Sequence, residues 1–357
     1  MNKKRFAGIT SMALAGTLAL ALVGCGGATP AAKDAGSAEA TKSTYKVAMV
    51  TDMGGVNDQS FNQLAWEGLQ QLSKDTGIKV GYTESKQEAD YAPNLDKATD
   101  QGNDLVWGIG FAMSKAIQEH AKKNPDVHVA IIDSAYGDAE QLDNLTGVTF
   151  RSQEPSFVVG YIAAMTSQTG KVGFVGGVKS DVLNTFEYGY RAGVAYANKE
   201  NGKNVEVSVQ YLETFTDAAK GKAAGQKLYA DGCDVIFQAA GNAGNGVIEA
   251  AVDANKLVIG VDKDQHAQAP ENVLTSALKR VDKAVIEVSE MASKGKEIGR
   301  QNINLGMAED AAGISEHHEL MSDDVYQKAL DLVKQIKDGK IMPPASEKDF
   351  NSYTASL

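Results

Sequence analysis

The chain has 357 residues, with 35 lysines and arginines against 46 aspartates and glutamates, and a formal net charge of −11. A single hydrophobic core stops growing at about 250–300 residues, so a folded part of this length is expected to form two lobes. The sequence has no cluster of lysines and arginines that would offset this negative net charge. This argues against nucleic acid and anionic lipid as partners of the folded domain.

Residues 1–24 have the pattern of a secretory signal peptide. "MNKKR" supplies positive charge, and "FAGITSMALAGTLALALVG" is an apolar run with small residues toward its end. Leu22, Val23 and Gly24 lead directly into Cys25, which resembles a bacterial lipobox, whose cysteine takes a diacylglyceryl group. Two or more acyl chains give stable anchoring, at about 0.8 kcal/mol for each buried methylene. We therefore expect a lipid anchor at Cys25 on the extracytoplasmic face of the cell membrane, rather than a membrane-spanning segment.

Residues 25–44 are expected to hold the lipidated cysteine and a flexible tether. The segment 26–44 is rich in Ala, Gly, Ser, Thr and Lys and has almost no large apolar side chains. Such a composition cannot bury enough surface to offset chain entropy. The folded domain is therefore expected over residues 45–357.

From Tyr45 onward, short apolar runs alternate with segments of helical period. The apolar runs, most of them rich in Val and Ile, predict strands at 45–52, 78–85, 104–110, 127–133, 145–150, 171–177, 205–213, 233–241 and 256–264. The helical period predicts helices at 59–75, 112–123, 154–168, 184–200, 217–231, 244–255, 281–295 and 324–338. This repetition is typical of an α/β protein with two doubly wound parallel sheets.

The order of the predicted strands and helices also divides the chain into two lobes. We expect lobe 1 at about 45–150 with a returning segment near 275–300. Lobe 2 is expected at about 151–274 with part of the C-terminal segment. The final third has less regular rhythm, and we interpret it as strands and helices that cross back and close both lobes.

Catalytic and metal-binding motifs are not found in the sequence. There is no GxSxG elbow, no HExxH helix and no phosphate loop ending in GKS or GKT. The adjacent His317 and His318 lack the spacing that places two ligands on one helical face, and the lone Cys233 is predicted to be a buried core residue. Asp262 and Asp264, near the end of a predicted strand, could form an acid pair or a metal site, but we expect only one of them to be functional. We therefore expect no enzyme activity, no metal and no cofactor.

Polar loops follow the predicted strands, and ligands of open α/β sheets bind outside the carboxyl ends of strands. Phe61 and Phe186 each fall on the expected first turn of the helix that follows the first strand of a lobe. If the lobes face each other, a flat heterocycle could stack between these rings, whereas Trp66 lies on another helical face and is predicted to pack in the core. This arrangement favours a solute receptor whose lobes close around a small molecule.

Four motifs carry a family resemblance: "GGVNDQSFNQLAWEGL", "FEYGYRAGV", "VIGVDKDQ" and "LTSALKRVDKAV". Together they resemble the basic membrane lipoprotein family, whose better-understood members are purine-nucleoside receptors of ABC transporters. The resemblance implies a type I periplasmic-binding-protein fold with a nucleoside in the cleft, an ABC permease as partner, and a chain that we expect to be monomeric. The alternative within this fold is a sugar or autoinducer receptor. A second role as an adhesive or immune-facing surface lipoprotein stays open.

The resemblance also implies a set of ligand-binding residues. Phe61 and Phe186 would clamp the base, Asp262 and Lys279 would bind the ribose, and Gly241 would offer a backbone contact. The remaining positions, matched to base or cleft contacts, are Asp58, Asn62 and Asp133. Four of these residues have structural alternatives: Asp58 and Asp262 as caps of local structure, Lys279 as a solvated residue, and Phe186 as ordinary packing.

Overall fold

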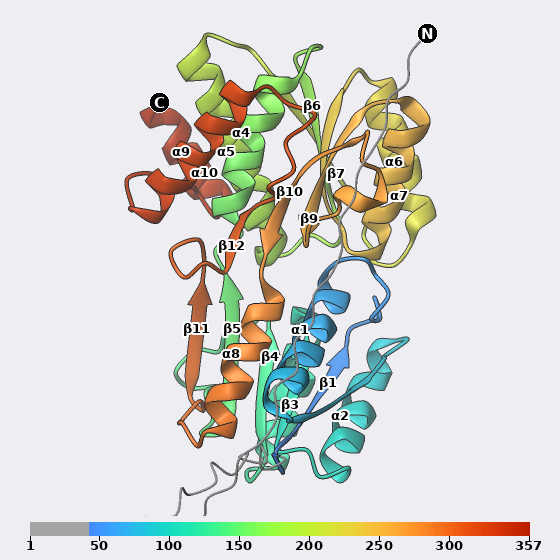
Figure 1. Ribbon diagram of the computed structural model, residues 1–357, viewed down its shortest axis with the longest axis vertical. Coiled ribbons are helices and arrows are strands. Elements are labelled where there is room, and N and C mark those ends of the chain that lie inside the picture. Colours follow the sequence, from blue (N-terminus) through green and yellow to red (C-terminus); the bar gives the residue numbers. More distant parts are fainter. Residues whose placement is uncertain (1–42) are drawn as a thin grey trace, which may run out of the picture. The chain divides into compact units, whose positions relative to one another are not determined.

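The computed structural model describes residues 43–357 (Figure 1). The expected signal peptide, the lipidation site Cys25 and nearly all of the tether lie outside the described residues. Two six-stranded sheets are present in residues 43–357. We call each sheet, together with the helices that pack against it, lobe 1 and lobe 2.

Lobe 1 is built on a fully parallel sheet with the strand order β11-β5-β4-β3-β1-β2. Its elements are β1 (Lys46–Thr51), α1 (Phe61–Thr76), β2 (Lys79–Thr83), η1 (Glu88–Asp90), α2 (Tyr91–Asp100), β3 (Leu105–Ile109), η2 (Phe111–Met113), α3 (Ser114–Lys123), β4 (His128–Ile132), β5 (Leu145–Phe150), α8 (Val281–Ser293) and β11 (Gln301–Leu305). The strand order reverses at β1, which lies between β2 and β3, so the carboxyl ends of β1 and β3 flank a topological switch point.

Lobe 2 repeats this arrangement with the order β12-β10-β9-β8-β6-β7, in which only the β10–β12 pair is antiparallel. Its elements are α4 (Gln153–Thr166), β6 (Lys171–Gly176), α5 (Asp181–Asn201), β7 (Glu206–Tyr211), α6 (Ala218–Ala230), β8 (Val235–Ala239), α7 (Asn242–Ala254), β9 (Leu257–Asp262), η3 (His266–Gln268), β10 (Val273–Lys279), β12 (Ala312–Ile314), α9 (Asp323–Lys337) and α10 (Glu347–Ser356).

The predicted fold class is confirmed. All nine predicted strands are present, and each predicted helix is found with small shifts at its ends. The Val/Ile-rich runs are buried on both faces, as parallel strands covered by helices require; all of Leu105–Ile109 and Val235–Ala239, for example, is buried. The final third adds three strands that the sequence pattern did not delimit, β10, β11 and β12.

The chain crosses between the lobes three times, after β5, after β10 and after β11 (Figure 1). Because β10 belongs to the sheet of lobe 2, the chain returns to lobe 1 only after Lys279, and α8 then packs against α1. The first and third crossings are joined by side chains. Arg151 forms ion pairs with Glu154 and Glu309, and the backbone N–H of Met307 donates to Glu154 Oε2 at 2.6 Å.

The core of lobe 2 contains an unusually close pair of helices, α4 and α5. Residues 154–164 of α4 are buried without interruption. A Cβ atom on Gly193 of α5 would lie 1.9 Å from the carbonyl oxygen of Phe157, and one on Gly160 of α4 would lie 2.2 Å from that of Tyr190. The glycines therefore permit a backbone-to-backbone approach that no larger residue allows. In residues 43–357, no helix has both the length and the apolar character needed to cross a membrane.

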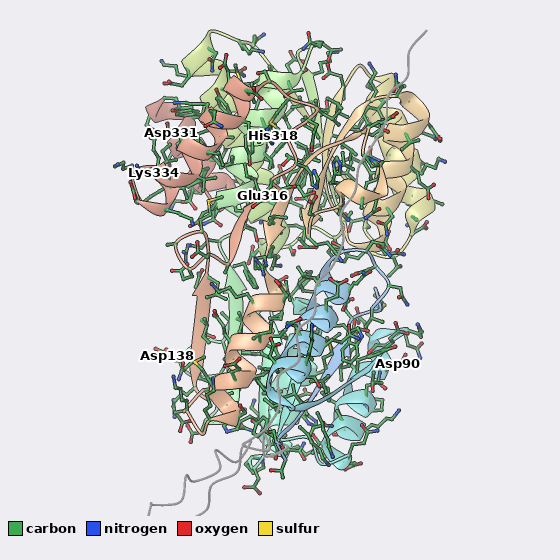
Figure 2. The ribbon with its side chains drawn as sticks, in the orientation of Figure 1. Asp90, Asp138, Glu316, His318, Asp331 and Lys334 are labelled. Atoms are coloured by element: carbon green, nitrogen blue, oxygen red, sulfur yellow. The ribbon has the colours of Figure 1, made fainter. Side chains whose placement is uncertain are left out.

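The outer surfaces of both lobes carry dispersed charges of both signs (Figure 2). On lobe 1, Asp138 is exposed and Asp90 is partly exposed, and Asp331 and Lys334 belong to α9 of lobe 2. Most ion pairs at the surface, such as Lys115–Glu119 on α3, join exposed side chains. Such pairs contribute little to stability, at about 0–1 kcal/mol each.

Candidate functional site

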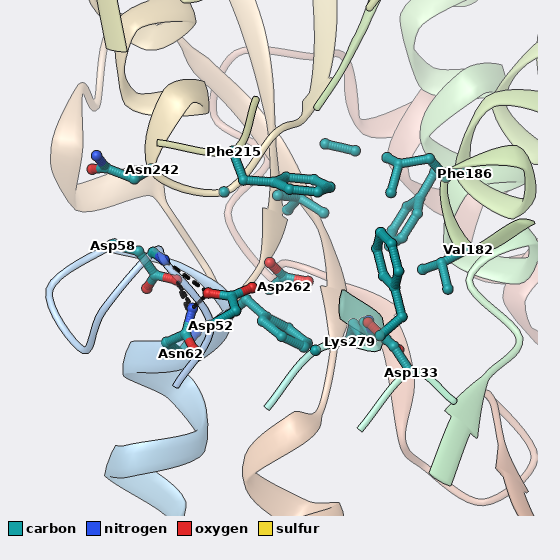
Figure 3. A pocket seen from close by; sticks show the side chains of 18 residues that line it. Asp52, Asp58, Asn62, Asp133, Val182, Phe186, Phe215, Asn242, Asp262 and Lys279 are labelled. Atoms are coloured by element: carbon teal, nitrogen blue, oxygen red, sulfur yellow. Dashed lines mark hydrogen bonds and ion pairs between the residues drawn. The ribbon is translucent and has the colours of Figure 1, made fainter. Parts of the chain in front are cut away.

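A pocket lies where the carboxyl ends of strands from both lobes meet (Figure 3). All eight residues predicted as ligand-binding line it. The full lining is Asp52, Gly54, Asp58, Phe61, Asn62, Gly110, Phe111, Asp133, Val182, Leu183, Phe186, Phe215, Ala239, Gly241, Asn242, Val261, Asp262 and Lys279. The structure thus brings together residues that are as far apart in the sequence as Asp58 and Lys279.

Asp58 caps the first turn of α1. Its carboxylate accepts hydrogen bonds from the backbone N–H groups of Ser60, Asn62 and Gln63 at 2.8–3.0 Å, and from the Asn62 side chain at 3.0 Å. A carboxylate offers about four lone-pair sites, so these four donors occupy it. The cap stabilises the helix terminus and fixes the direction in which Phe61 and Asn62 leave it.

Asp133 and Asp262 occupy equivalent positions in the two lobes. Asp133 directly follows β4, the fourth strand of lobe 1 in chain order, and Asp262 is the last residue of β9, the fourth strand of lobe 2. Both have a left-handed backbone, with φ of +68° and +66°, which is uncommon outside glycine. Both are buried, at 8% and 5% exposed. Backbone conformations of this kind often occur at functional sites, where the surrounding structure holds them.

Lys279, at the end of β10, is 2% exposed and pairs with Asp133 across the lobes at 2.5 Å. Its Nζ atom also lies 4.7 Å from the ring centroid of Phe61 and 5.8 Å from that of Phe186. Lys279 is therefore not a solvated residue. The direct partner of its ammonium is Asp133, whereas Asp262 accepts a hydrogen bond from the Ser60 hydroxyl at 2.5 Å.

Two carboxyl groups of the pocket have raised pKa values. Burial raises the pKa of Asp262 to about 6, although the nearby ammonium group of Lys279 acts in the opposite direction and lowers it. Burial likewise raises the pKa of Asp52 to about 6, although the N–H of Gly54 and the amide of Asn62 hydrogen-bond to it and lower it. Both groups are partly protonated near pH 6, where a carboxyl group donates as well as accepts a hydrogen bond.

The two predicted aromatic residues differ in their surroundings. Phe61 is the first residue of α1 and is partly buried, at the edge of the lobe 1 core. Phe186 is 4% exposed and packs against Phe237, with ring centroids 6.4 Å apart. It lies on the second turn of α5, not the first as predicted, because α5 begins at Asp181, where Ser180 accepts a hydrogen bond from the N–H of Leu183.

Several lining residues were not singled out by the sequence analysis. Phe111 of lobe 1 and Phe215 of lobe 2 approach edge to face, with centroids 6.1 Å apart, and Val182 and Leu183 add apolar surface. Asp52 follows β1 directly. All of them lie in or beside loops after strands, a signal that locates a residue near the site but does not say which way its side chain points.

Gly241 lies before α7 with φ of +56°, ψ of −135°. This backbone conformation is poorly accessible to residues that have a Cβ atom. A glycine at this position keeps the pocket wall next to Phe215 free of a side chain.

Outside the pocket, the described residues bring His266, His317 and Glu319 together, with possible ligand atoms within 4.8 Å of one another. The two imidazole rings are stacked, with planes 5° apart, so their in-plane nitrogen lone pairs do not converge on one point. His318, which is labelled in Figure 2, does not belong to this group, and its ring stacks on that of Tyr326. This geometry does not resemble a formed metal site.

Comparisons with known proteins agree with this architecture. A family model described as "ABC transporter substrate-binding protein PnrA-like" matches residues 45–347. The CD4+ T-cell-stimulating antigen of Listeria innocua is 39% identical over 96% of this chain and 99% of that protein. The ABC transporter nucleoside-binding protein BmpA of Lactococcus lactis is 35% identical, again over 96% and 99%.

Among solved structures, an ABC transporter solute-binding protein from Aeropyrum pernix superimposes with a TM-score of 0.78 at 27% identity. The match covers 86% of this chain and 96% of that one. The predicted type I periplasmic-binding-protein fold is confirmed by this similarity.

Proposed function

Because the chain belongs to the family of PnrA-like substrate-binding proteins of ABC transporters, we propose that it captures a purine nucleoside between its lobes and delivers it to an ABC permease. The observation that carries the proposal is the composition of the pocket. Phe61 of lobe 1 and Phe186 of lobe 2 line it together with the carboxyl groups of Asp133 and Asp262 and the ammonium of Lys279. The name of the Lactococcus lactis relative, a nucleoside-binding protein, supports the same ligand class.

The aromatic residues suit the base. Phe61 and Phe186 belong to different lobes and both lie within 6 Å of Lys279 Nζ, measured to the ring centroids. A purine that stacks on an aromatic side chain gains about 1–3 kcal/mol per contact. Phe111 and Phe215 extend the apolar wall, so an aglycone without charge is favoured.

Two acceptors suit the polar edge of the base. Among the described residues, Asn62 Oδ1 is buried and has no hydrogen-bond partner. Asp52 accepts the bonds from Gly54 and Asn62 on Oδ1, and its Oδ2 is the oxygen we assign to a ligand N–H. Buried polar atoms are generally hydrogen-bonded, so an unpaired acceptor in a pocket indicates a donor on the ligand. Asp58, whose carboxylate is occupied by the α1 cap, then positions Asn62 instead of binding the base.

The charged group at the centre of the pocket suits the ribose. The Lys279 ammonium has three N–H donors, and its bond to Asp133 occupies one of them. Asp262 supplies a carboxyl group beside it. Hydroxyl groups both donate and accept, so a carboxylate next to an ammonium satisfies them after water is expelled.

A lipid anchor at Cys25 would keep the receptor near its permease on the extracytoplasmic face of the membrane. The proposal rests on the sequence of the leader, because Cys25 lies outside the described residues. Replacing Cys25 with serine should release the protein from the membrane fraction. Mass spectrometry of the mature N-terminal peptide should find a diacylglyceryl group on Cys25; an unmodified thiol would contradict the anchor.

A thermal-shift panel tests the ligand class. A ligand at 100 times its dissociation constant adds about 2.7 kcal/mol to the free energy of unfolding. Inosine, guanosine or adenosine should raise the melting temperature, whereas ribose and free phosphate should not. If only ribose or another sugar raises it, the sugar-receptor alternative is correct.

A matched pair of variants tests the role of Phe61. Phe61→Leu keeps an apolar side chain but removes the ring, so it should weaken nucleoside binding by about 1–3 kcal/mol. Phe350→Leu, on α10 away from the pocket lining, removes a ring without affecting the site. Equal affinities of the two variants would show that Phe61 does not stack on the ligand.

A further inference from the structure

The loop before α1 is held from lobe 2 by three consecutive contacts. The Asn245 side chain donates to the carbonyl oxygen of Asp58 at 3.1 Å, and the Gln265 side chain donates to the carbonyl oxygen of Gln59 at 3.1 Å. The Ser60 hydroxyl completes the series through Asp262. We call Asn245 and Gln265 the loop clamp, because both bind main-chain carbonyl groups of residues 58–59.

The clamped loop determines the position of pocket residues in lobe 1. It carries the Asp58 cap and leads directly into Phe61 and Asn62, which line the pocket. Gln59 has φ of +58°, in the left-handed region that residues with a Cβ atom seldom adopt. Such a conformation persists only where neighbouring groups hold it, and the clamp supplies two of those groups.

Gln265 is held by hydrogen bonds within lobe 2 in addition to its bond to the loop. Its Oε1 accepts hydrogen bonds from the Gln238 side chain at 2.7 Å and from the N–H of Val261 at 2.9 Å. Its own N–H donates to the Ser276 hydroxyl at 3.1 Å, and the residue is 1% exposed. All of these partners belong to lobe 2, so only the bond to Gln59 depends on closure of the lobes.

We propose that Asn245 and Gln265 are positioning residues that couple lobe closure to ligand retention. Neither residue lines the pocket. Gln265 reaches the pocket only through the loop, whereas Asn245 also donates a hydrogen bond to Oδ1 of Asn242, a lining residue, at 3.1 Å. In the closed state they hold the loop that presents Phe61 and Asn62. When the lobes separate, these bonds are lost. The part of the inference that concerns ligand retention rests on the proposed function; the part that concerns closure does not.

The kinetic test uses Asn245→Ala and Gln265→Glu with inosine as the probe. Gln265→Glu is nearly isosteric and keeps an acceptor oxygen for Gln238 and Val261. It replaces the donor to Gln59 with a carboxylate oxygen that repels the Gln59 carbonyl oxygen, so its effect should be at least as large as that of one lost hydrogen bond. Losing one hydrogen bond in the closed state should raise the dissociation rate about tenfold. The association rate should change less than twofold, because the open state does not contain these bonds. The affinity ratio of inosine to adenosine should stay the same, since no ligand contact is removed.

Two control variants remove amides of the same lobe that lie at its exposed surface, Asn351→Ala and Gln268→Glu. Both should leave the dissociation rate unchanged. Dissociation rates of the two clamp variants that equal the wild-type rate would overturn the proposal. An altered inosine-to-adenosine ratio in Gln265→Glu would also overturn it, because that result would place Gln265 at the ligand.

Small-angle X-ray scattering of the ligand-free protein separates failure of the clamp from failure of the proposed ligand. The clamp variants should shift the population toward an open form with a larger radius of gyration than the wild type and the controls. This result would support the clamp even if inosine does not bind. If Asn245→Ala, which leaves the buried network of Gln265 intact, has the same radius of gyration as the wild type, the clamp does not stabilise closure.

Discussion

Replacing Lys279 with methionine is expected to destabilise the protein strongly at neutral pH. Lys279 and Asp133 are 2% and 8% exposed, and their charged atoms lie 2.5 Å apart. Removing one partner of a buried ion pair leaves the other charge without compensation, at a cost of about 3–5 kcal/mol. Lys279 also lowers the pKa of Asp262, so the substitution should raise the pKa of that carboxyl group further above about 6.

Urea-induced unfolding at pH 7 and pH 5 measures this effect. A carboxyl group with a raised pKa in the folded state binds protons more tightly there, so stability increases as the pH falls through that pKa. The loss caused by Lys279→Met should therefore be smaller at pH 5 than at pH 7. Adding Asp133→Asn should recover a large part of the loss at pH 7, because it removes the uncompensated charge.

Lys74→Met serves as the control, since Lys74 is exposed on α1. It should change the free energy of unfolding by less than about 0.5 kcal/mol. A loss below about 1 kcal/mol for Lys279→Met at pH 7, or no recovery on adding Asp133→Asn, would refute the reasoning.

Three further substitutions test the pocket and the core by denaturation. Asp52→Asn keeps the acceptor oxygen and removes a carboxyl group whose folded-state pKa burial raises to about 6, against 3.8 in the unfolded chain. It should add about 1–2 kcal/mol of stability at pH 7 and reduce the loss of stability seen as the pH rises from 4 to 6; an unchanged pH profile would contradict the raised pKa. Gly193→Ala should lower the free energy of unfolding by about 1–3 kcal/mol, because the added methyl group pushes α5 away from α4. The control Gly81→Ala, with nothing within 4 Å of the added atom, should have a much smaller effect. Equal melting temperatures of the two variants would exclude the close approach of the helices. Ser180→Ala should cost about 0.5–2 kcal/mol through loss of the α5 cap, and Ser180→Asp should retain the stability; an equal loss in both would show that the cap bond is not the cause.

The sequence predicts the fold well because both of its signals are local. Alternating strand and helix periods locate nearly every element of the first two thirds, and the rule that ligands bind at the carboxyl ends of strands selects the loops that line the pocket. The periodicity fails in the final third. There, β11 has the polar sequence QNINL and is largely exposed, and β12 has only three residues, so neither strand has the buried Val/Ile-rich run by which the others are recognised.

The contacts inside the site depend on packing between lobes, which local patterns do not encode. Lys279 pairs with Asp133, 146 residues away, and Ser60 pairs with Asp262, 202 residues away. The prediction for Trp66 was only partly right, although its contacts lie within lobe 1. Its ring borders the core of lobe 1 but is partly exposed, where it packs on Tyr82 with centroids 4.8 Å apart.

Competition between candidate ligands tests the central claim most directly. The protein is incubated with an equimolar mixture of purine nucleosides, pyrimidine nucleosides, ribose and free purine bases, separated from unbound molecules, and denatured to release what it retains. Liquid chromatography with mass spectrometry then identifies the ligand and its amount per chain. The account predicts one purine nucleoside per chain, reduced in Phe61→Leu. Retention of ribose, or of a free base in preference to its nucleoside, would contradict it.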